Sequence, residues 1–299
     1  MNMEKQNKAN PGAIFHFDCK VHGRSDGSNA VKLAAYRAGA RLKAETTGRI
    51  HNYCRKKEVL WSEILAPENA PAWAKDRQAL WSAVDRIEHR CDAQLAREVE
   101  VALPLALSPS DHCNLLRDWV GETFVSHGMV ADICYHAKRG NPHSHILLTL
   151  RDIDAHGFGK KNRSWNALSL VESWRASWAE IVNRYLEKAG HEIRIDHRSF
   201  KRQGLDLTPT KHVGRETPWN GQKVADVSME NKLILVERVL HEQKREQKKA
   251  AELVKPQETV VPTTSPVCIP TQRPSRVRRP RPARVQTNPG FVRGSEPSF

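Results

Sequence analysis

The chain has 299 residues, with 48 lysines and arginines against 34 aspartates and glutamates, so its formal net charge is +14. This length allows one large domain or two small ones with a hydrophobic core, and the basic character favours a polyanionic partner, most often nucleic acid or an anionic membrane surface. The sequence has no apolar run of the roughly 18 residues that a membrane-spanning helix needs. The polar N-terminus lacks the apolar core of a signal peptide, and six scattered cysteines without a CxxC pair argue against a disulfide framework, so a reducing cytoplasm is expected.

The first quarter of the chain predicts one strand and two helices. Residues 13–21 alternate between apolar and polar side chains, which is typical of a half-buried strand. The alanine-rich segment 30–43 predicts a helix, residues 44–72 are mixed and rich in turns, and residues 73–92 predict an amphipathic helix.

The next segment predicts a second strand and a well-marked helix. Residues 97–103 alternate, with Glu98 and Glu100 on one face and aliphatic side chains on the other. The following helix has Ser108 as its N-cap, a proline at its first position and Gly128 after its end.

Two further strands, 129–136 and 143–151, are predicted on either side of a turn at 137–142, and residues 164–190 form an amphipathic helix. Because the strands alternate instead of running continuously apolar, the order of elements predicts an α+β fold. We expect a central antiparallel sheet with helices packed on one face.

The C-terminal part differs in composition. After a loop-rich stretch to about residue 220, residues 229–253 predict a highly charged helix. Residues 255–299 interleave proline with arginine and carry a net charge of +6, which leaves +8 on residues 1–254. Such a composition predicts a disordered basic tail.

Three histidines form the most informative pattern. His143 and His145 are two apart on a predicted strand, so both imidazoles project from the same face. The hairpin turn at 137–142 would bring His136 opposite or diagonal to this pair. Three converging imidazoles are good metal ligands that leave coordination positions open for a substrate. The alternative is a polar sheet face with solvated histidines.

Tyr36 lies in a helix that is otherwise built of small residues and follows a polar loop. Its alanine neighbours leave the ring room to reach outward and Arg37 is adjacent, so the phenol is a candidate nucleophile. The alternative is an aromatic side chain of the core. Glu98 or Glu100 could orient a histidine or approach a metal directly, or the two could form a solvent-facing acidic edge.

Together these residues resemble the MobA/MobL family of plasmid relaxases (MobQ-type), which belong to the histidine-hydrophobe-histidine (HUH) endonucleases. The resemblance covers about two-thirds of the chain, and four segments carry it: AIFHF with SNAVKLAAYRAG in 13–39, REVEVALP at 97–104, GNPHSHILLTLR at 140–151 and IDHRSFKRQGLDLTPTKHVG at 195–214.

The resemblance implies an HUH relaxase fold and an enzyme that nicks and rejoins one DNA strand at an origin of transfer, through a 5′-phosphotyrosyl intermediate. Tyr36 matches the family's nucleophile, and His136, His143 and His145 match its metal ligands. Glu98 or Glu100 matches the acidic residue of its second motif.

The implied cofactor is a divalent metal, Mg²⁺ or Mn²⁺, with Zn²⁺ as an alternative on ligand grounds. The implied partners are single-stranded plasmid DNA, accessory mobilisation proteins and the coupling protein of a type IV secretion system, in the bacterial cytoplasm. The basic residues proposed to contact DNA are Arg24, Arg37, Lys138, Arg139 and Arg198. The expected organisation is an N-terminal extension at 1–12, a relaxase domain at 13–220, a charged helical extension at 221–254 and the basic tail at 255–299.

Two alternatives belong to other classes. A rolling-circle replication initiator or transposase would use the same chemistry, but in those enzymes the tyrosine usually follows the histidines, whereas Tyr36 precedes them. A non-catalytic DNA-binding mobilisation protein would not need an intact tyrosine and three histidines.

Overall fold

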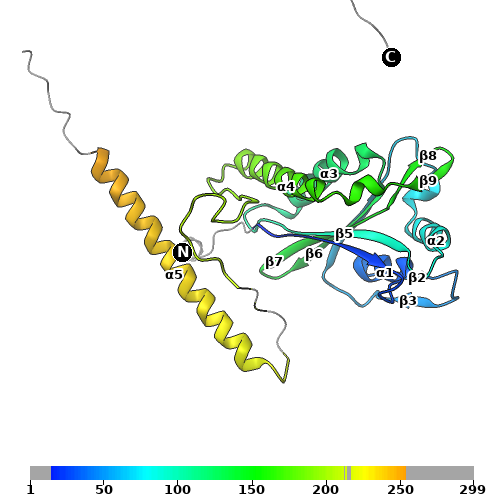
Figure 1. Cartoon of the computed structure of the whole chain (residues 1–299), viewed down its shortest axis with the longest axis horizontal. Helices are drawn as coiled ribbons and strands as arrows, with labels where there is room; N and C mark the ends of the chain where they lie inside the picture. The colour runs from blue at the N-terminus through cyan, green and yellow to red at the C-terminus, as the bar shows by residue number, and fades with distance from the viewer. Residues whose placement is uncertain (1–14, 212, 214–216, 254–299) are drawn as a thin grey trace, which may run out of the picture. The chain divides into compact units, whose positions relative to one another are not determined.

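A computed structural model describes residues 15–211, 213 and 217–253, so the expected N-terminal extension and basic tail lie outside the described residues (Figure 1). Its centre is a sheet of five strands in which every neighbouring pair is antiparallel. In spatial order the strands are β1 (Phe17–Gly23), β5 (Gln94–Ala102), β7 (Asn141–Leu148), β6 (Ala131–Lys138) and β4 (Val59–Leu65). The predicted antiparallel α+β fold is confirmed.

Helices cover both faces of this sheet, which corrects the expectation of helices on one face (Figure 1). One face packs against α3 (Pro109–Thr123) and α4 (Leu168–Lys188), and the other packs against α1 (Ala30–Ala38) and α2 (Arg77–Ile87). Strand β7 shows the reason, because its alternate side chains enter different cores.

The two cores are separate clusters. Ile146 and Leu148 of β7 lie in the cluster with Trp119 and Trp178, from α3 and α4. Leu147, between them, lies in the cluster that α1 and α2 build from small alanines and Trp81. The histidines alternate in phase with Leu147, so they belong to the α1 side of the sheet.

Helix α1 ends five residues earlier than the expected segment 30–43. It begins after the N-cap Asn29, whose side chain accepts from the Lys32 amide, and it ends at Gly39, a left-handed C-cap with φ of 60°. The chain then turns into a small hairpin of β2 (Arg41–Lys43) and β3 (Ile50–Asn52).

Changing Gly39 to alanine is expected to lower the free energy of unfolding by about 2 kcal/mol. A left-handed conformation costs a non-glycine residue roughly 1–2 kcal/mol, and the new Cβ would lie 3.1 Å from Cγ2 of Val59. Gly48→Ala is the matched control, because Gly48 has a similar φ of 69° but nothing within 4 Å of its Cβ position. Urea unfolding measures both, and equal losses would contradict a role for the Val59 contact.

Strand β4 lies in the segment 44–72 that was expected to be mixed and rich in turns. It is an edge strand whose side chains are mostly half-buried, so it lacks the strict alternation that marks the other strands. The expected helix 73–92 is divided: a 3₁₀ turn (η1, Ala72–Lys75) precedes α2, which is capped by the Asp76 side chain accepting from the Ala79 amide.

The predicted start of α3 is confirmed. Ser108 and Asp111 form a reciprocal capping box, with Pro109 at the first helical position. The helix stops at Thr123, and a 3₁₀ turn (η2, Val125–His127) leads to Gly128, which is left-handed.

The β6–β7 hairpin is tighter than the expected turn at 137–142. Lys138 pairs with Asn141, which leaves Arg139 and Gly140 as a two-residue turn with Gly140 at φ 73°. After β7 comes a second hairpin that the sequence did not predict, formed by β8 (Arg151–Asp154) and β9 (Gly157–Lys161).

A 3₁₀ turn, η3 (Arg163–Asn166), precedes α4, and the described residues between α4 and residue 220 contain neither helix nor strand, as expected. Helix α5 spans Gly221–Leu253 and starts eight residues before the expected 229. The chain divides into two compact units, Met1–Ile234 and Leu235–Phe299. None of the helices in the described part of the chain combines the length and apolar character needed to cross a membrane.

Candidate active site

The strand register brings the three predicted histidines together. His136 of β6 lies opposite His143 of β7, and His145 is the next residue on the same face of β7. The ring centroids are 4.9 Å apart for His136 and His145 and 5.2 Å apart for the other two pairs. One ring nitrogen from each histidine lies within 4.8 Å of the others, so the cluster can hold a metal ion.

Hydrogen bonds orient the two histidines of β7. Nδ1 of His145 donates to Oε1 of Glu98 over 2.7 Å, and Nδ1 of His143 donates to the backbone oxygen of Asn141 over 2.9 Å. In each ring the proton is therefore fixed on Nδ1, which leaves the lone pair of Nε2 for a metal.

The third histidine contacts the helix that carries Tyr36. Nε2 of His136 donates to the backbone oxygen of Arg37 over 2.7 Å. In this arrangement Nδ1 is the ring nitrogen with the free lone pair. The bond joins the histidine cluster to the last turn of α1.

Burial favours the neutral form of two of the histidines, His136 and His143. It lowers the pKa of His136 to about 4, against the opposing effect of the bond to the Arg37 oxygen. Burial also lowers the pKa of His143 from its ordinary value. Neutral imidazoles near neutral pH have the free lone pairs that metal coordination requires, so this donor set fits a divalent ion.

Glu98 is a buried carboxylate at the centre of the site. It accepts from Nδ1 of His145, from Nε2 of His22 at 2.5 Å, and from the guanidinium of Arg37, whose Nη2 is 2.9 Å away. Burial alone would raise the pKa of Glu98, but the hydrogen bonds from His145, His22 and Arg37 outweigh it and hold the pKa well below its ordinary value.

Glu100 has a different place. Its side chain is 28 % exposed, and Oε2 lies 3.7 Å from Nδ1 of His145, beyond hydrogen-bonding distance. The sequence left open which of Glu98 and Glu100 supports a histidine, and the structure distinguishes them: Glu98 bonds to His145 directly.

Tyr36 lies on the last turn of α1 and is 43 % exposed, so it is not a core aromatic. The ring of Tyr53 meets it edge to face, with centroids 5.1 Å apart. Nζ of Lys56 lies 3.9 Å from the centroid of the Tyr36 ring. Since Arg37 is the next residue and its carbonyl oxygen meets His136, the tyrosine and the histidine cluster share one region of the protein.

Two of the five arginines and lysines expected to contact DNA are engaged within the fold. The guanidinium of Arg24 bonds to the side chain and carbonyl of Asp85 and to the carbonyl of Glu88, at the end of α2. The guanidinium of Arg37 bonds to Glu98. Both guanidinium groups have buried partners within the fold, and their contact with DNA stays a prediction.

The other three are at the surface. Lys138 and Arg139 are exposed at the β6–β7 turn, next in the chain to the histidine-bearing parts of both strands. Arg198 is exposed in the loop after α4, where its guanidinium bonds to Asp196.

Sequence reasoning missed three residues of the site. His22 continues the polar face of the first strand by one step beyond the expected end at 21, so extending the alternation would have found it. Tyr53 and Lys56 lie in the patternless segment before β4, and only the folded chain brings them to Tyr36.

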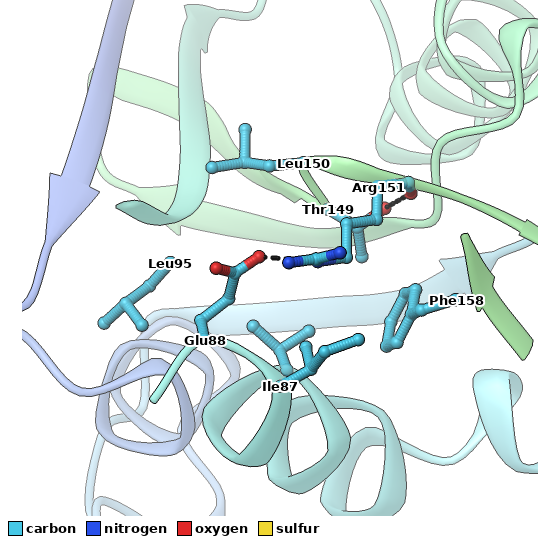
Figure 2. A pocket seen from close by; sticks show the side chains of 8 residues that line it. Ile87, Glu88, Leu95, Thr149, Leu150, Arg151 and Phe158 are labelled. Atoms are coloured by element: carbon cyan, nitrogen blue, oxygen red, sulfur yellow. Dashed lines mark hydrogen bonds and ion pairs between the residues drawn. The ribbon is translucent and has the colours of Figure 1, made fainter. Parts of the chain in front are cut away.

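A cavity elsewhere in the domain offers no comparable chemistry. It lies between the end of α2 and the β8–β9 hairpin, and Figure 2 shows the largely apolar side chains that line it. Its carboxylate, Glu88, already pairs with Arg151 at 2.8 Å and with Lys161 at 2.9 Å. The histidine cluster and Tyr36 do not line it.

The fold and site define an α+β protein with a cluster of three histidines that can hold a metal ion, and with an exposed tyrosine on the adjoining helix. The sequence model of the MobA/MobL family matches residues 28–223, and the chain belongs to this family.

Two relatives and one solved structure show the extent of the similarity. The chain is 36 % identical to the conjugal transfer protein TraA of Rhizobium radiobacter, over 68 % of this chain and 21 % of TraA. It is 34 % identical to the mobilization protein MobL of Acidithiobacillus ferridurans, over 68 % of this chain and 62 % of MobL. A structure described as "Molecular Basis of Vancomycin Resistance Transfer in Staphylococcus aureus" has a TM-score of 0.60 and 31 % identity, and the match covers 62 % of this chain and all of that one. The aligned region spans about a fifth of TraA.

Proposed function

We propose that this protein is a plasmid-mobilisation relaxase that nicks and rejoins one DNA strand at an origin of transfer. The observation that carries the proposal is the bond from His136 to the Arg37 carbonyl, which sets the helix of the exposed Tyr36 against the three-histidine cluster. Relatives named for conjugal transfer and mobilization support it.

The proposed reaction is a transesterification. The phenol oxygen of Tyr36 attacks the scissile phosphorus, and the bond from this phosphorus to the 3′ oxygen breaks. The tyrosine is then joined through the phosphate to the 5′ end of the cleaved strand. The tyrosine gives up its proton and the departing 3′ oxygen takes one up, so atoms and charge balance. One phosphodiester replaces another, so the reverse reaction rejoins the strand without an external energy source.

His136, His143 and His145 would hold a divalent metal, which when bound would polarise the phosphate and offset negative charge in the transition state. We infer Mg²⁺ or Mn²⁺ as the working ion, with phosphate oxygens and water completing the ligand set. Zn²⁺ suits an imidazole set as well. Glu98 orients His145, and the carbonyl of Asn141 orients His143.

Single-stranded plasmid DNA is the proposed substrate. Lys138, Arg139 and Arg198 would bind its phosphates, with a salt-dependent affinity. We further propose accessory mobilisation proteins and a secretion coupling protein as partners, in the bacterial cytoplasm.

The proposed organisation keeps the relaxase domain at 13–220, a charged helical extension at 221–254 and a basic tail at 255–299. The end of the family match at residue 223 supports the C-terminal boundary proposed for the relaxase domain.

His143→Ala tests the proposal. Mutating a residue that only hydrogen-bonds to a metal ligand typically lowers metal affinity by roughly 10- to 100-fold. Removing a ligand itself is expected to lower the affinity for Mn²⁺ by more than this, and to abolish the covalent adduct with single-stranded origin DNA. Calorimetry measures the first effect and a denaturing gel the second. His156→Ala, which removes an exposed histidine of the β8–β9 turn, is the control. Normal adduct formation by the His143 variant would exclude the histidine cluster from the reaction.

A further inference from the structure

The connection from β3 to β4 folds over the end of α1. The Tyr53 amide donates to the Ala40 oxygen over 3.0 Å, and the Lys56 amide donates to the Tyr53 oxygen over 3.0 Å. The connection packs against Gly39, because Cβ of Lys56 lies 3.6 Å from where a Cβ on Gly39 would be, an ordinary van der Waals distance. The backbone of this connection is thus fixed against the last turn of the helix that carries Tyr36.

This backbone arrangement places the Lys56 side chain over Tyr36. Nζ of Lys56 lies 3.9 Å from the centroid of the Tyr36 ring and donates to the Tyr36 backbone oxygen over 3.1 Å. The side chain is only 14 % exposed, and the carboxylate of Glu58 is 3.6 Å away and about half exposed. A lysine on a protein surface normally keeps its ammonium group in water, so this contact is a specific one.

Two groups restrict the Tyr36 ring besides the adjacent Arg37, whose Cζ lies 5.1 Å from the ring centroid. Tyr53 meets it edge to face, and the Lys56 ammonium lies over its face. Both arrangements are favoured by the charge distribution of an aromatic ring, which is negative on the face and positive at the edge.

We propose that Lys56 is a positioning residue for the Tyr36 nucleophile. It holds the ring in the orientation for attack, and its positive charge stabilises the negative charge that gathers around the phenol oxygen and the phosphate in the transition state. The inference rests on the proposed function, and it adds a residue outside the histidine cluster and its supporting carboxylate.

In a purely structural role, Nζ of Lys56 would only donate a hydrogen bond to the Tyr36 carbonyl, one of the carbonyls in the last turn of α1 that lack a partner within the helix. The two roles predict different effects when the positive charge of Lys56 is removed. A structural role affects thermal stability, whereas the proposed role affects the rate at saturating DNA and leaves DNA affinity alone.

The test compares Lys56→Met, Lys56→Arg and the control Lys57→Met in single-turnover nicking of an origin oligonucleotide with Mn²⁺. Methionine keeps the stem and removes the charge, and Lys57 is the exposed neighbour with the same charge. Lys56→Met is expected to lower the rate at saturating DNA by about tenfold or more, with a DNA Kd within about twofold of that of Lys57→Met. Arginine at 56 is expected to restore most of the rate. Equal rates for the two methionine variants would overturn the proposal.

A second readout does not depend on nicking. The chain has only four tyrosines, so the ring resonances of Tyr36 can be assigned by NMR with Tyr36→Phe as the reference. Lys56→Met is expected to shift these resonances, and Lys57→Met is not. If the wild-type protein fails to nick DNA but the Tyr36 resonances shift in Lys56→Met, the proposed function fails and the positioning contact stands. If they do not respond in Lys56→Met or in Lys56→Gln, a second folded variant, the positioning role is overturned.

Discussion

Tyr36→Phe is expected to abolish the covalent adduct with origin DNA, with a fall in nicking rate on the order of 10⁴-fold or more. The change removes only the phenol oxygen. The ring keeps its edge-to-face contact with Tyr53 and its place beneath Lys56, so the surface that meets DNA is preserved. DNA affinity is therefore expected to stay within about twofold of the wild type. A denaturing gel with labelled oligonucleotide measures the adduct, and peptide mapping locates it.

Tyr53→Phe is the matched control, because it removes the hydroxyl of the tyrosine whose ring centroid is only 5.1 Å away. This variant should form the adduct normally. An adduct that persists in Tyr36→Phe and disappears in Tyr53→Phe would assign the nucleophile to Tyr53.

Glu98→Gln is expected to cost about 3–5 kcal/mol in the free energy of unfolding, the range for removing one partner of a buried ion pair. The variant leaves the guanidinium of Arg37, which is only 13 % exposed, without its carboxylate. It also weakens the bond that fixes the His145 ring, so the affinity for Mn²⁺ should fall by about 10- to 100-fold. Urea unfolding and calorimetry measure the two effects.

Glu100→Gln serves as the comparison for Glu98→Gln. The two carboxylates are on one face of β5, but Glu100 is partly exposed and does not bond to His145. Its loss is expected to change the free energy of unfolding by less than about 0.5 kcal/mol, as at most surface positions. Similar losses in both variants would remove the special role that we assign to Glu98.

The sequence predicted the elements whose patterns are local. Alternation marked β5, β6 and β7, and the capping residues Ser108 and Asp111 marked the start of α3. The histidine cluster could be predicted for the same reason, since a spacing of two on one strand and a short hairpin fix which side chains share a face.

The remaining features depend on tertiary contacts. Strand β4 was missed because, as a half-buried edge strand, it has no clear alternation. Helices on both faces were missed because the side of α1 that packs on the sheet consists mostly of alanines, which give a weak amphipathic signal. The ion pair of Arg37 could not be predicted because nothing in its local sequence shows that Glu98, 61 residues later, is its partner.

Strand β7 carries two of the clustered histidines and part of the hydrophobic core. His143 and His145 alternate with Ser144, a buried residue whose hydroxyl donates to the Cys134 oxygen, and with Ile146 in the core. Inserting or deleting one residue in this strand would send the imidazoles into the core and the aliphatic side chains toward the metal side. Such a change would disrupt folding together with the histidine cluster, so the position of the histidines along the strand is tied to the packing of the core. Redesigning the histidine cluster for a chosen metal ion would therefore require side-chain substitutions that leave the length of β7 unchanged.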